Sequence, residues 1–201
     1  MSLPATQDPA ETHDSTSPSL APHVSGTTTS VRPLTEEDWS AWWRLRLLAL
    51  ASHPDSFAQD VDDTLAEGEQ AARHRFEADR IGGGNRLFGA FTGSGDLVGI
   101  AGIAASDWRK LRHRMEIGGV YVAPAARGNG TGAQLIAACI EHARGTDGVL
   151  QVHIGVASHN EVAIRLYERC GFVRYGREPR LLLLPDGTAV DEDLMVRMLD
   201  S

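Results

Sequence analysis

An apolar strand, a glycine-rich turn and an amphipathic helix follow one another from residue 120 to about residue 143. The strand Val120-Tyr121-Val122 leads into the turn Arg127-Gly128-Asn129-Gly130-Thr131-Gly132. Closely spaced glycines let a backbone approach a ligand, and the start of a helix offers unpaired N–H groups with a partial positive charge. We therefore expect this turn to hold a phosphate group.

Three phosphate-binding motifs compete for the turn. A P-loop requires a lysine after its last glycine, and the only lysine of the chain, Lys110, lies elsewhere. Gly128, Gly130 and Ala133 satisfy a dinucleotide-binding fingerprint. That fingerprint expects a carboxylate about 20 residues later, where residues 157–160 supply none. The third motif is the Arg/Gln-x-x-Gly-x-Gly/Ala turn of acyl-CoA-dependent N-acetyltransferases, which residues 127–132 match at each position.

A second motif follows the next strand. The segment from Asn160 through Tyr167 to Gly171-Phe172 is similar to the N-x-x-A-x-x-L-Y-x-x-x-G-F helix of the same family. With both motifs in this order, the chain resembles the GNAT superfamily of N-acetyltransferases over about residues 31–199. The resemblance implies an α/β fold with a mixed, strongly twisted, mostly antiparallel sheet and helices on both faces. In that fold, strands 114–122 and 149–156 splay apart and admit the pantetheine arm of the cofactor.

Composition and periodicity divide the chain into a tail and one domain. Residues 1–30 are rich in Ser, Thr and Pro and contain no Lys or Arg, which predicts a disordered tail before an N-acetyltransferase domain at 31–201. Glycines 118 and 119 predict a bulge in their strand, and Ser158 is a candidate cap of the motif helix. The expected strands are 31–35, 86–91, 97–103, 114–122, 149–156, 172–176, 180–184 and 194–199. Four helices are expected: one that Asp38 opens and Pro54 closes, one at 62–80, one after the glycine turn and one in the second motif.

The formal net charge of −8 makes nucleic acid an improbable partner and leans toward a cationic acceptor. The chain has neither a secretory signal pattern nor about 18 consecutive apolar residues, so we expect a cytoplasmic protein without a membrane span. Cys139 and Cys170 lie in separate predicted helices without metal-ligand spacing. They indicate buried thiols and no metal site. Dimerisation is common in the family, and a homodimer stays open.

The resemblance also implies which residues bind acetyl-CoA. Residues 127–132, namely Arg127, Gly128, Asn129, Gly130, Thr131 and Gly132, would hold the pyrophosphate, mainly through backbone N–H groups. The strand Val120-Tyr121-Val122 would pair with the pantetheine amides, and an N–H near Val122 would face the thioester oxygen. Asn160 would bind the cofactor or fix the start of its helix.

Two side chains are candidates for proton transfer. Tyr167 stands where the family places the general acid that protonates the leaving thiolate, although it also fits an apolar helix face. Glu116 is the candidate general base, acting directly or through water, and the alternative is a strand-end carboxylate that neutralises a neighbouring arginine. His113 is a rival base. His153 alternates within an apolar strand and reads as a hydrogen-bonded core histidine.

The sequence thus predicts an acetyl-CoA-dependent N-acetyltransferase that acts on a primary amine by direct attack, because neither cysteine occupies a motif position suited to an acetyl-enzyme. The acceptor is unidentified. Trp39, Trp42 and Trp43 indicate core packing, and Trp108 is a candidate for acceptor contact. The alternatives are a non-catalytic acyl-CoA-binding module or sensor and a nicotinamide-dependent oxidoreductase.

Overall fold

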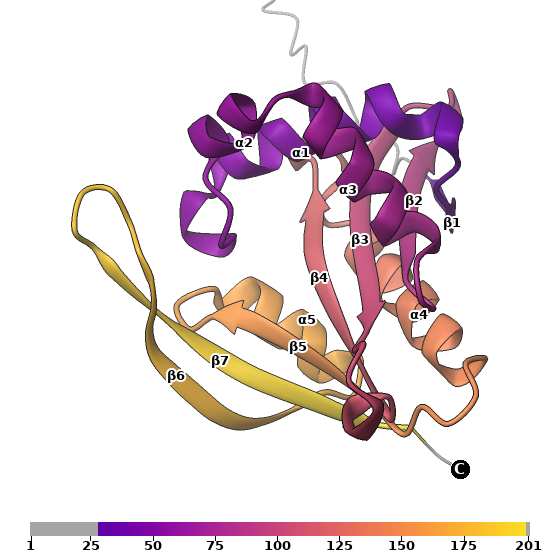
Figure 1. The fold of residues 1–201 in the computed structure, drawn as a ribbon, viewed down its shortest axis with the longest axis vertical. Coiled ribbons are helices and arrows are strands. Elements are labelled where there is room, and N and C mark those ends of the chain that lie inside the picture. The colour runs from indigo at the N-terminus through magenta and orange to yellow at the C-terminus, as the bar shows by residue number, and fades with distance from the viewer. Residues whose placement is uncertain (1–27, 200–201) are drawn as a thin grey trace, which may run out of the picture.

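The computed structural model describes residues 28–199, so residues 1–27 of the predicted tail lie outside it. Within this part, seven strands form one sheet with the order β1-β2-β3-β4-β5-β7-β6 (Figure 1). The elements are β1 (Thr29–Pro33), η1 (Glu36–Asp38), α1 (Trp39–Ser52), η2 (Pro54–Ser56), α2 (Val61–Glu67), α3 (Glu69–Ile81), β2 (Arg86–Thr92), β3 (Leu97–Ala105), η3 (Arg109–Leu111), β4 (Arg114–Val122), η4 (Pro124–Ala126), α4 (Thr131–Arg144), β5 (Gln151–Ala157), α5 (Glu161–Arg169), β6 (Val173–Leu183) and β7 (Ala189–Met198).

Among these strands, only β4 and β5 pair in parallel, and all other neighbours are antiparallel. This arrangement confirms the expected mixed, mostly antiparallel sheet. A dinucleotide-binding fold has a mostly parallel sheet, so the topology excludes that fold. Within residues 28–199, no helix has the length and apolar character needed to cross a bilayer.

Apolar side chains form two cores on opposite faces of the sheet. Helices α4 and α5 cover one face, and their cluster includes Ile136 and Tyr167. Helices α1 and α3 contribute to the cluster on the other face, which includes Trp42, Phe76 and Tyr121. Because successive strand residues alternate between faces, each face of β4 belongs to a different core.

Tryptophans anchor α1 to α3. Trp39 and Trp42 are buried, and the ring centroids of Trp39 and Phe76 lie 5.4 Å apart. Trp43 stacks on Trp39 at 5.6 Å between centroids. The prediction that these three tryptophans pack in the core is confirmed.

The predicted helix 62–80 is in fact two helices, α2 and α3. They meet at Gly68, whose φ of 86° lies in a region that residues with a side chain rarely adopt. Gly68 ends α2 and opens α3, so the chain changes direction there. The polar pattern of this stretch did not reveal the break.

The predicted strands 172–176 and 180–184 are one irregular strand, β6. Its pairing with β7 shifts between Arg174 and Gly176 and again between Glu178 and Leu182, around Pro179. An edge strand tolerates a proline because one side of its backbone needs no sheet partner. The closing strand β7 likewise begins at Ala189 and not near residue 194.

Candidate functional site

β4 and β5 pair only over their first residues, from Arg114 opposite Gln151 to Ile117 opposite Ile154. Beyond this point β4 continues to Val122 without a strand partner on that side, and the two strands diverge (Figure 1). The N–H of Ala123 donates to a carbonyl of β3, and backbone groups of successive residues point to opposite sides. The N–H of Val122 therefore points into the gap between β4 and β5.

A β-bulge lies where the pairing stops. Gly118 is opposite Gly102 and Tyr121 is opposite Ile100, so two residues of β4 face one residue of β3. Gly119, inside the bulge, has a φ of 63°. A bulge bends its strand and increases the local twist, which explains why β4 leaves β5 here. The bulge predicted from the paired glycines is confirmed.

The glycine turn forms an open cradle before α4. Gly128 and Gly130 have φ values of 82° and 79°, and a Cβ added to either would meet no atom within 4 Å. The described residues provide no hydrogen-bond partner for the backbone N–H groups of residues 128–133, and the first bond of α4 runs from Gln134 N to Gly130 O. Six consecutive amides at the positive end of a 14-residue helix fit an anionic group.

The connection between α1 and α2 crosses the wide end of the gap. Arg127 folds back from the turn, donating from Nε to Val122 O at 2.8 Å and from Nη2 to His53 Nε2 at 2.9 Å. On the β5 side, His159 Nε2 lies 2.7 Å from Asp55 Oδ2. These contacts tie the segment around η2 to the residues that follow both splayed strands. The side chain of Arg127 thus organises the site and does not extend along the turn.

Asn160 is the N-cap of α5, because its Oδ1 accepts a hydrogen bond from Ala163 N at 3.1 Å. This finding confirms that the residue fixes the start of its helix. Ser158, the cap suggested by the sequence, lies two residues too early, and its N–H donates to Asp191 O. The amide nitrogen of Asn160 has no partner among the described residues.

Tyr167 is buried in the core under α5, with its ring 6.2 Å from that of Phe172. Its hydroxyl has no hydrogen-bond partner within residues 28–199, yet it is not one of the fully enclosed polar atoms there. Burial raises the pKa of the phenol. The residue therefore carries its proton at neutral pH and has a hydroxyl that reaches the surface of the core.

Glu116 lies on the other face of the sheet, since its neighbours Met115 and Ile117 point into the α4 core. Its side chain is 64% exposed, and Oε2 lies 3.8 Å from Arg114 Nη2. His153 is its register partner on β5. The prediction of His153 as a hydrogen-bonded core residue holds only in part. The residue is half-buried, its Nδ1 forms a hydrogen bond of 3.3 Å with the hydroxyl of Tyr175, and its Nε2 is enclosed without a partner among the described residues.

Glu192 of β7 also lies on this face, although no sequence motif pointed to it. Its carboxylate lies over Gly155 of β5, where a Cβ would come within 2.4 Å of it. Burial, and then the charges of Glu116 and Glu178, raise the pKa of this carboxyl group. The glycine at position 155 was the one sequence feature related to this contact. Its meaning becomes clear only when the β5–β7 register is known.

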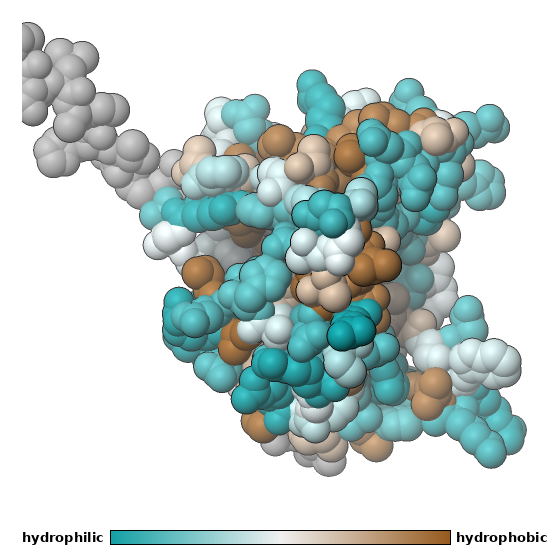
Figure 2. Space-filling view, turned by 90° about the vertical axis from the view of Figure 1, so that its left-hand side faces the viewer, coloured by the Kyte–Doolittle hydropathy of each residue, from teal (hydrophilic) through white to brown (hydrophobic). Residues whose placement is uncertain are grey.

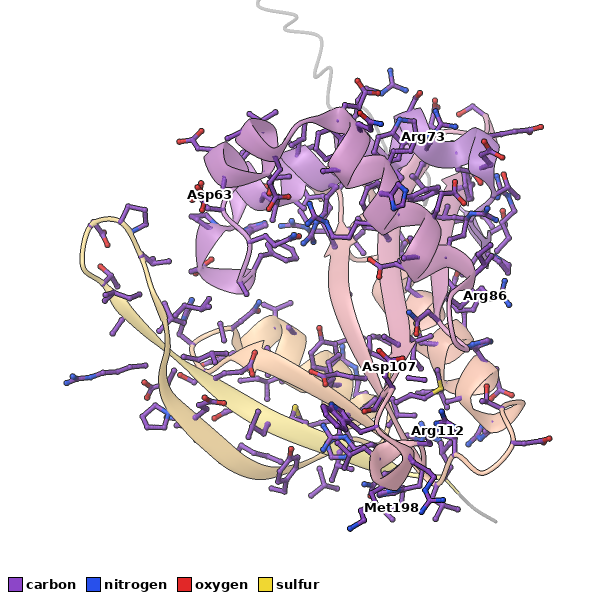
Figure 3. All side chains as sticks on the ribbon, in the orientation of Figure 1. Asp63, Arg73, Arg86, Asp107, Arg112 and Met198 are labelled. Atoms are coloured by element: carbon purple, nitrogen blue, oxygen red, sulfur yellow. The ribbon has the colours of Figure 1, made fainter. Side chains whose placement is uncertain are left out.

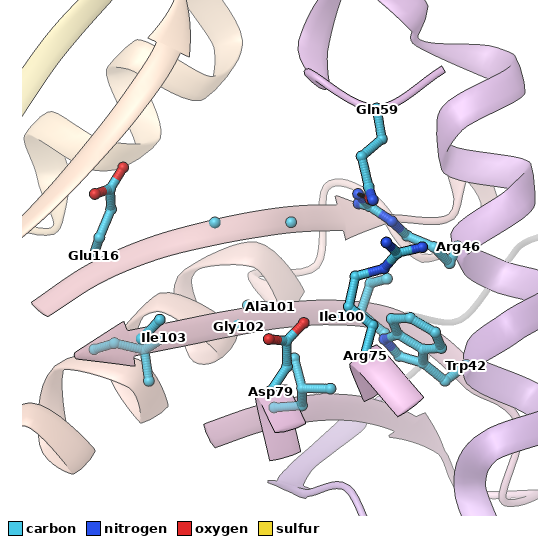
Figure 4. A pocket seen from close by; sticks show the side chains of 14 residues that line it. Trp42, Arg46, Gln59, Arg75, Asp79, Ile100, Ala101, Gly102, Ile103 and Glu116 are labelled. Atoms are coloured by element: carbon cyan, nitrogen blue, oxygen red, sulfur yellow. Dashed lines mark hydrogen bonds between the residues drawn. The ribbon is translucent and has the colours of Figure 1, made fainter. Parts of the chain in front are cut away.

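A cavity of about 340 Å³ opens on the same face (Figure 4). It extends from Arg46 and Asp79, contributed by α1 and α3, toward Glu116 near the start of β4 (Figure 4). The lining residues are Trp42, Arg46, Gln59, Arg75, Asp79, Leu87, Ile100, Ala101, Gly102, Ile103, Ala104, Glu116, Gly118 and Gly119.

Trp108 does not line this cavity and is 76% exposed. Its neighbours Asp107 and Arg112 lie at the end of the molecule away from Asp63 of α2 (Figure 3). Acceptor contact through Trp108 therefore has no support.

The face from which the β6–β7 hairpin projects is mostly hydrophilic, with smaller apolar areas between the polar side chains (Figure 2).

Comparison with known proteins identifies the family that the two sequence motifs resemble. The model of the "Acetyltransferase (GNAT) family" matches residues 42–172. A mycothiol acetyltransferase of Actinosynnema mirum is 34% identical over 154 residues, which cover 73% of this chain and 44% of that protein. A streptothricin acetyltransferase of Streptomyces lavendulae is 33% identical over 128 residues, covering 64% and 59%. The matched stretch spans about half the length of these relatives.

Solved structures agree on the fold. A phosphinothricin acetyltransferase of Sinorhizobium meliloti, in complex with AcCoA, has a TM-score of 0.73 and covers 86% of this chain and 89% of its own. The two sequences are 20% identical, so this likeness bears on the fold alone. It confirms the fold class expected from the sequence.

Proposed function

This chain belongs to the GNAT family of acetyltransferases, and we propose that it transfers acetyl from acetyl-CoA to a primary amine by direct attack of the amine on the thioester. The observation that carries the proposal is the end of β4–β5 pairing after Ile117, beside an open glycine cradle. The gap would admit the pantetheine arm, and the backbone N–H groups of residues 128–133 would hold the pyrophosphate. Val120, Tyr121 and Val122 would border the arm.

The two faces of the splayed sheet divide the reactants. Tyr167 belongs to the α4–α5 face, whereas Glu116 and the cavity belong to the α1–α3 face. A thioester in the gap would be open to attack from the cavity side. In this arrangement the amine and the leaving sulfur meet different side chains.

Each proposed catalytic group has one task. The N–H of Val122 would donate to the thioester oxygen, where negative charge grows during attack. The protonated hydroxyl of Tyr167 would donate its proton to the departing sulfur. Glu116 would accept the proton of the attacking amine through water, and the neighbouring carboxylate of Glu192 would favour an ammonium group at this end of the cavity.

Thiol release in the presence of acetyl-CoA and a panel of amines tests the proposal. We expect release that depends on the amine and stoichiometric N-acetylation detected by mass spectrometry. Binding of acetyl-CoA without release for any amine would favour the alternative of a non-catalytic acyl-CoA-binding module. A cytoplasmic location and a homodimer stay proposals; the free thiols of Cys139 and Cys170 agree with a reducing compartment.

A further inference from the structure

Arg46 of α1 is a charged side chain held in the cavity without a carboxylate partner. Its Nη2 donates to the neutral Oε1 of Gln59 at 2.7 Å, and its guanidinium lies 4.8 Å from the centre of the Phe57 ring. No salt bridge to Arg46 exists within residues 28–199, whereas Arg75 and Arg80 of α3 each pair with a glutamate. Of the two arginines that line the cavity, Arg75 has a salt bridge and Arg46 has none among the described residues.

Burial makes this arrangement unfavourable unless an anion completes it. Burial lowers the pKa of the Arg46 guanidinium to about 10, the charge of Asp79 partly opposes this effect, and that of Arg75 adds to it. A guanidinium is planar and offers its N–H groups in a fork that matches a carboxylate. A ligand carboxylate in the cavity would therefore replace water around a charge that the protein leaves unpaired.

Asp79 is the protein's own candidate partner for Arg46, but the two side chains do not pair directly. Both residues line the cavity (Figure 4), and they form neither a hydrogen bond nor a salt bridge with each other. Burial raises the pKa of the Asp79 carboxyl group, and Arg75 and Arg46 only partly oppose this effect. The charge of Asp79 therefore compensates that of Arg46 only in part, without a direct contact.

The position of Arg46 relates it to the proposed reaction centre. Its Nη1 lies 3.7 Å from the place where a Cβ of Gly119 would stand, inside the bulge at which β4 leaves β5. Glu116 lies three residues earlier on the same strand, about 10 Å away along it. Positive charge at one end of the cavity and negative charge at the other would orient a molecule that carries both signs.

We propose that the acetyl acceptor is a zwitterionic amine of the amino-acid class, whose carboxylate binds Arg46 and whose amine faces the gap and Glu116. This inference rests on the proposed acetyl transfer and narrows its substrate. It differs from the expectation based on net charge, which leaned toward a cationic acceptor. Local charge within the cavity governs recognition, and the overall charge of −8 is spread over the whole chain.

Matched acceptors test the proposal in the thiol-release assay. Each set contains an L-amino acid, its carboxamide and the amine that lacks the carboxyl group. One set is L-methionine, L-methioninamide and 3-(methylthio)propylamine, and the other sets cover the remaining common side chains. Spermidine and kanamycin represent cationic acceptors. The amine of the amide has the lower pKa, so more of it is unprotonated at neutral pH. A preference for the acid at that pH would therefore not come from a larger supply of free amine. We expect kcat/KM for the best acid to exceed that of its amide by about 10- to 100-fold, because hydrogen bonds to a charged group are lost.

Arg46→Gln should remove this preference, and Arg46→Lys should keep part of it. The matched control is Arg80→Gln, which removes an arginine of α3 that pairs with Glu77 and does not line the cavity. A thermal shift with acetyl-CoA shows that each variant folds. The proposal is overturned if amides or cationic amines are preferred, if Arg46→Gln lowers acid and amide alike, or if acetyl-CoA binds but no acid is acetylated. If the unmodified chain does not bind acetyl-CoA, the proposed function itself is overturned.

Discussion

At the scale of single residues, Tyr167 combines an observed structural role with the proposed role in proton transfer. Its ring fills the core against Phe172, and its hydroxyl has no partner among the described residues. The two readings of this tyrosine from the sequence are therefore compatible. The side chain that packs the helix α5 would also be held in place for the proposed proton donation.

Tyr167→Phe separates these roles, because phenylalanine keeps the ring and removes only the hydroxyl. We expect kcat to fall by about 100-fold, a value typical of a lost general acid, with unchanged acetyl-CoA affinity. Steady-state kinetics and a binding isotherm measure the two effects. Tyr175→Phe, which removes the hydroxyl of an exposed tyrosine, is the control and should retain most of the activity. Equal kcat in both variants would remove Tyr167 from the mechanism.

The roles of Glu116 and Glu192 differ in the pH profile that each would change. Glu116→Gln should lower kcat by about 10-fold or more at pH 7 and move the rise of the rate to higher pH, because the amine then loses its proton without a positioned base. Glu192→Gln removes a carboxyl group whose pKa is raised by burial and by Glu116, and should have the smaller effect. The reverse order in the two pH–rate series would assign the base to Glu192.

At the scale of elements, the effect of the turn before α4 on cofactor binding can be separated from its effect on the stability of the domain. Gly130→Ala places a side chain at a φ of 79°, and Gly148→Ala does so at 78° in the loop after α4. Neither Cβ meets a neighbouring atom, so both changes should destabilise the fold by about 1 kcal/mol. Only Gly130→Ala should weaken acetyl-CoA binding, measured by calorimetry. Equal affinities would show that the pyrophosphate does not bind at this turn.

The start of α1 provides a pH-dependent contribution to stability. Asp38 accepts hydrogen bonds from Arg32 at 2.7 and 2.8 Å and from the Thr35 N–H, and these contacts lower the pKa of its carboxyl group to about 2. The carboxylate thus binds the strand before it and does not cap α1 itself.

Because this pKa is lower in the folded state, the stabilisation is complete above about pH 4 and disappears as the pH falls toward 2. It amounts to at most about 2 kcal/mol, and to less because Arg32 is half exposed. Urea unfolding should show Asp38→Asn less stable than the unmodified chain at pH 6, with the difference shrinking below pH 4. A difference that stays constant with pH would contradict the assigned ion pair.

At the scale of the whole molecule, the sequence revealed those parts of the fold that short motifs specify. Residues 127–132 predicted the open turn, and Gly118-Gly119 predicted the bulge, because glycines with positive φ leave a local signature. Features that depend on distant pairing were missed. The β5–β7 register brings Glu192 close enough to Glu116 for their charges to interact, and the packing of α1 on the sheet brings Arg46 to Gly119. The proposed cofactor side of the site could therefore largely be predicted from sequence, and the proposed acceptor side could not.

The central claim is that acetyl-CoA occupies the gap between β4 and β5 and the turn beside it. A thermal shift with acetyl-CoA, coenzyme A and NAD, each added separately to the purified chain, tests it most directly. A ligand at about 100 times its dissociation constant stabilises a fold by about 2.7 kcal/mol, which raises the Tm of a domain of this size by several degrees. We predict such a rise with acetyl-CoA and coenzyme A and none with NAD. No rise with acetyl-CoA, or an equal rise with NAD, would contradict the account.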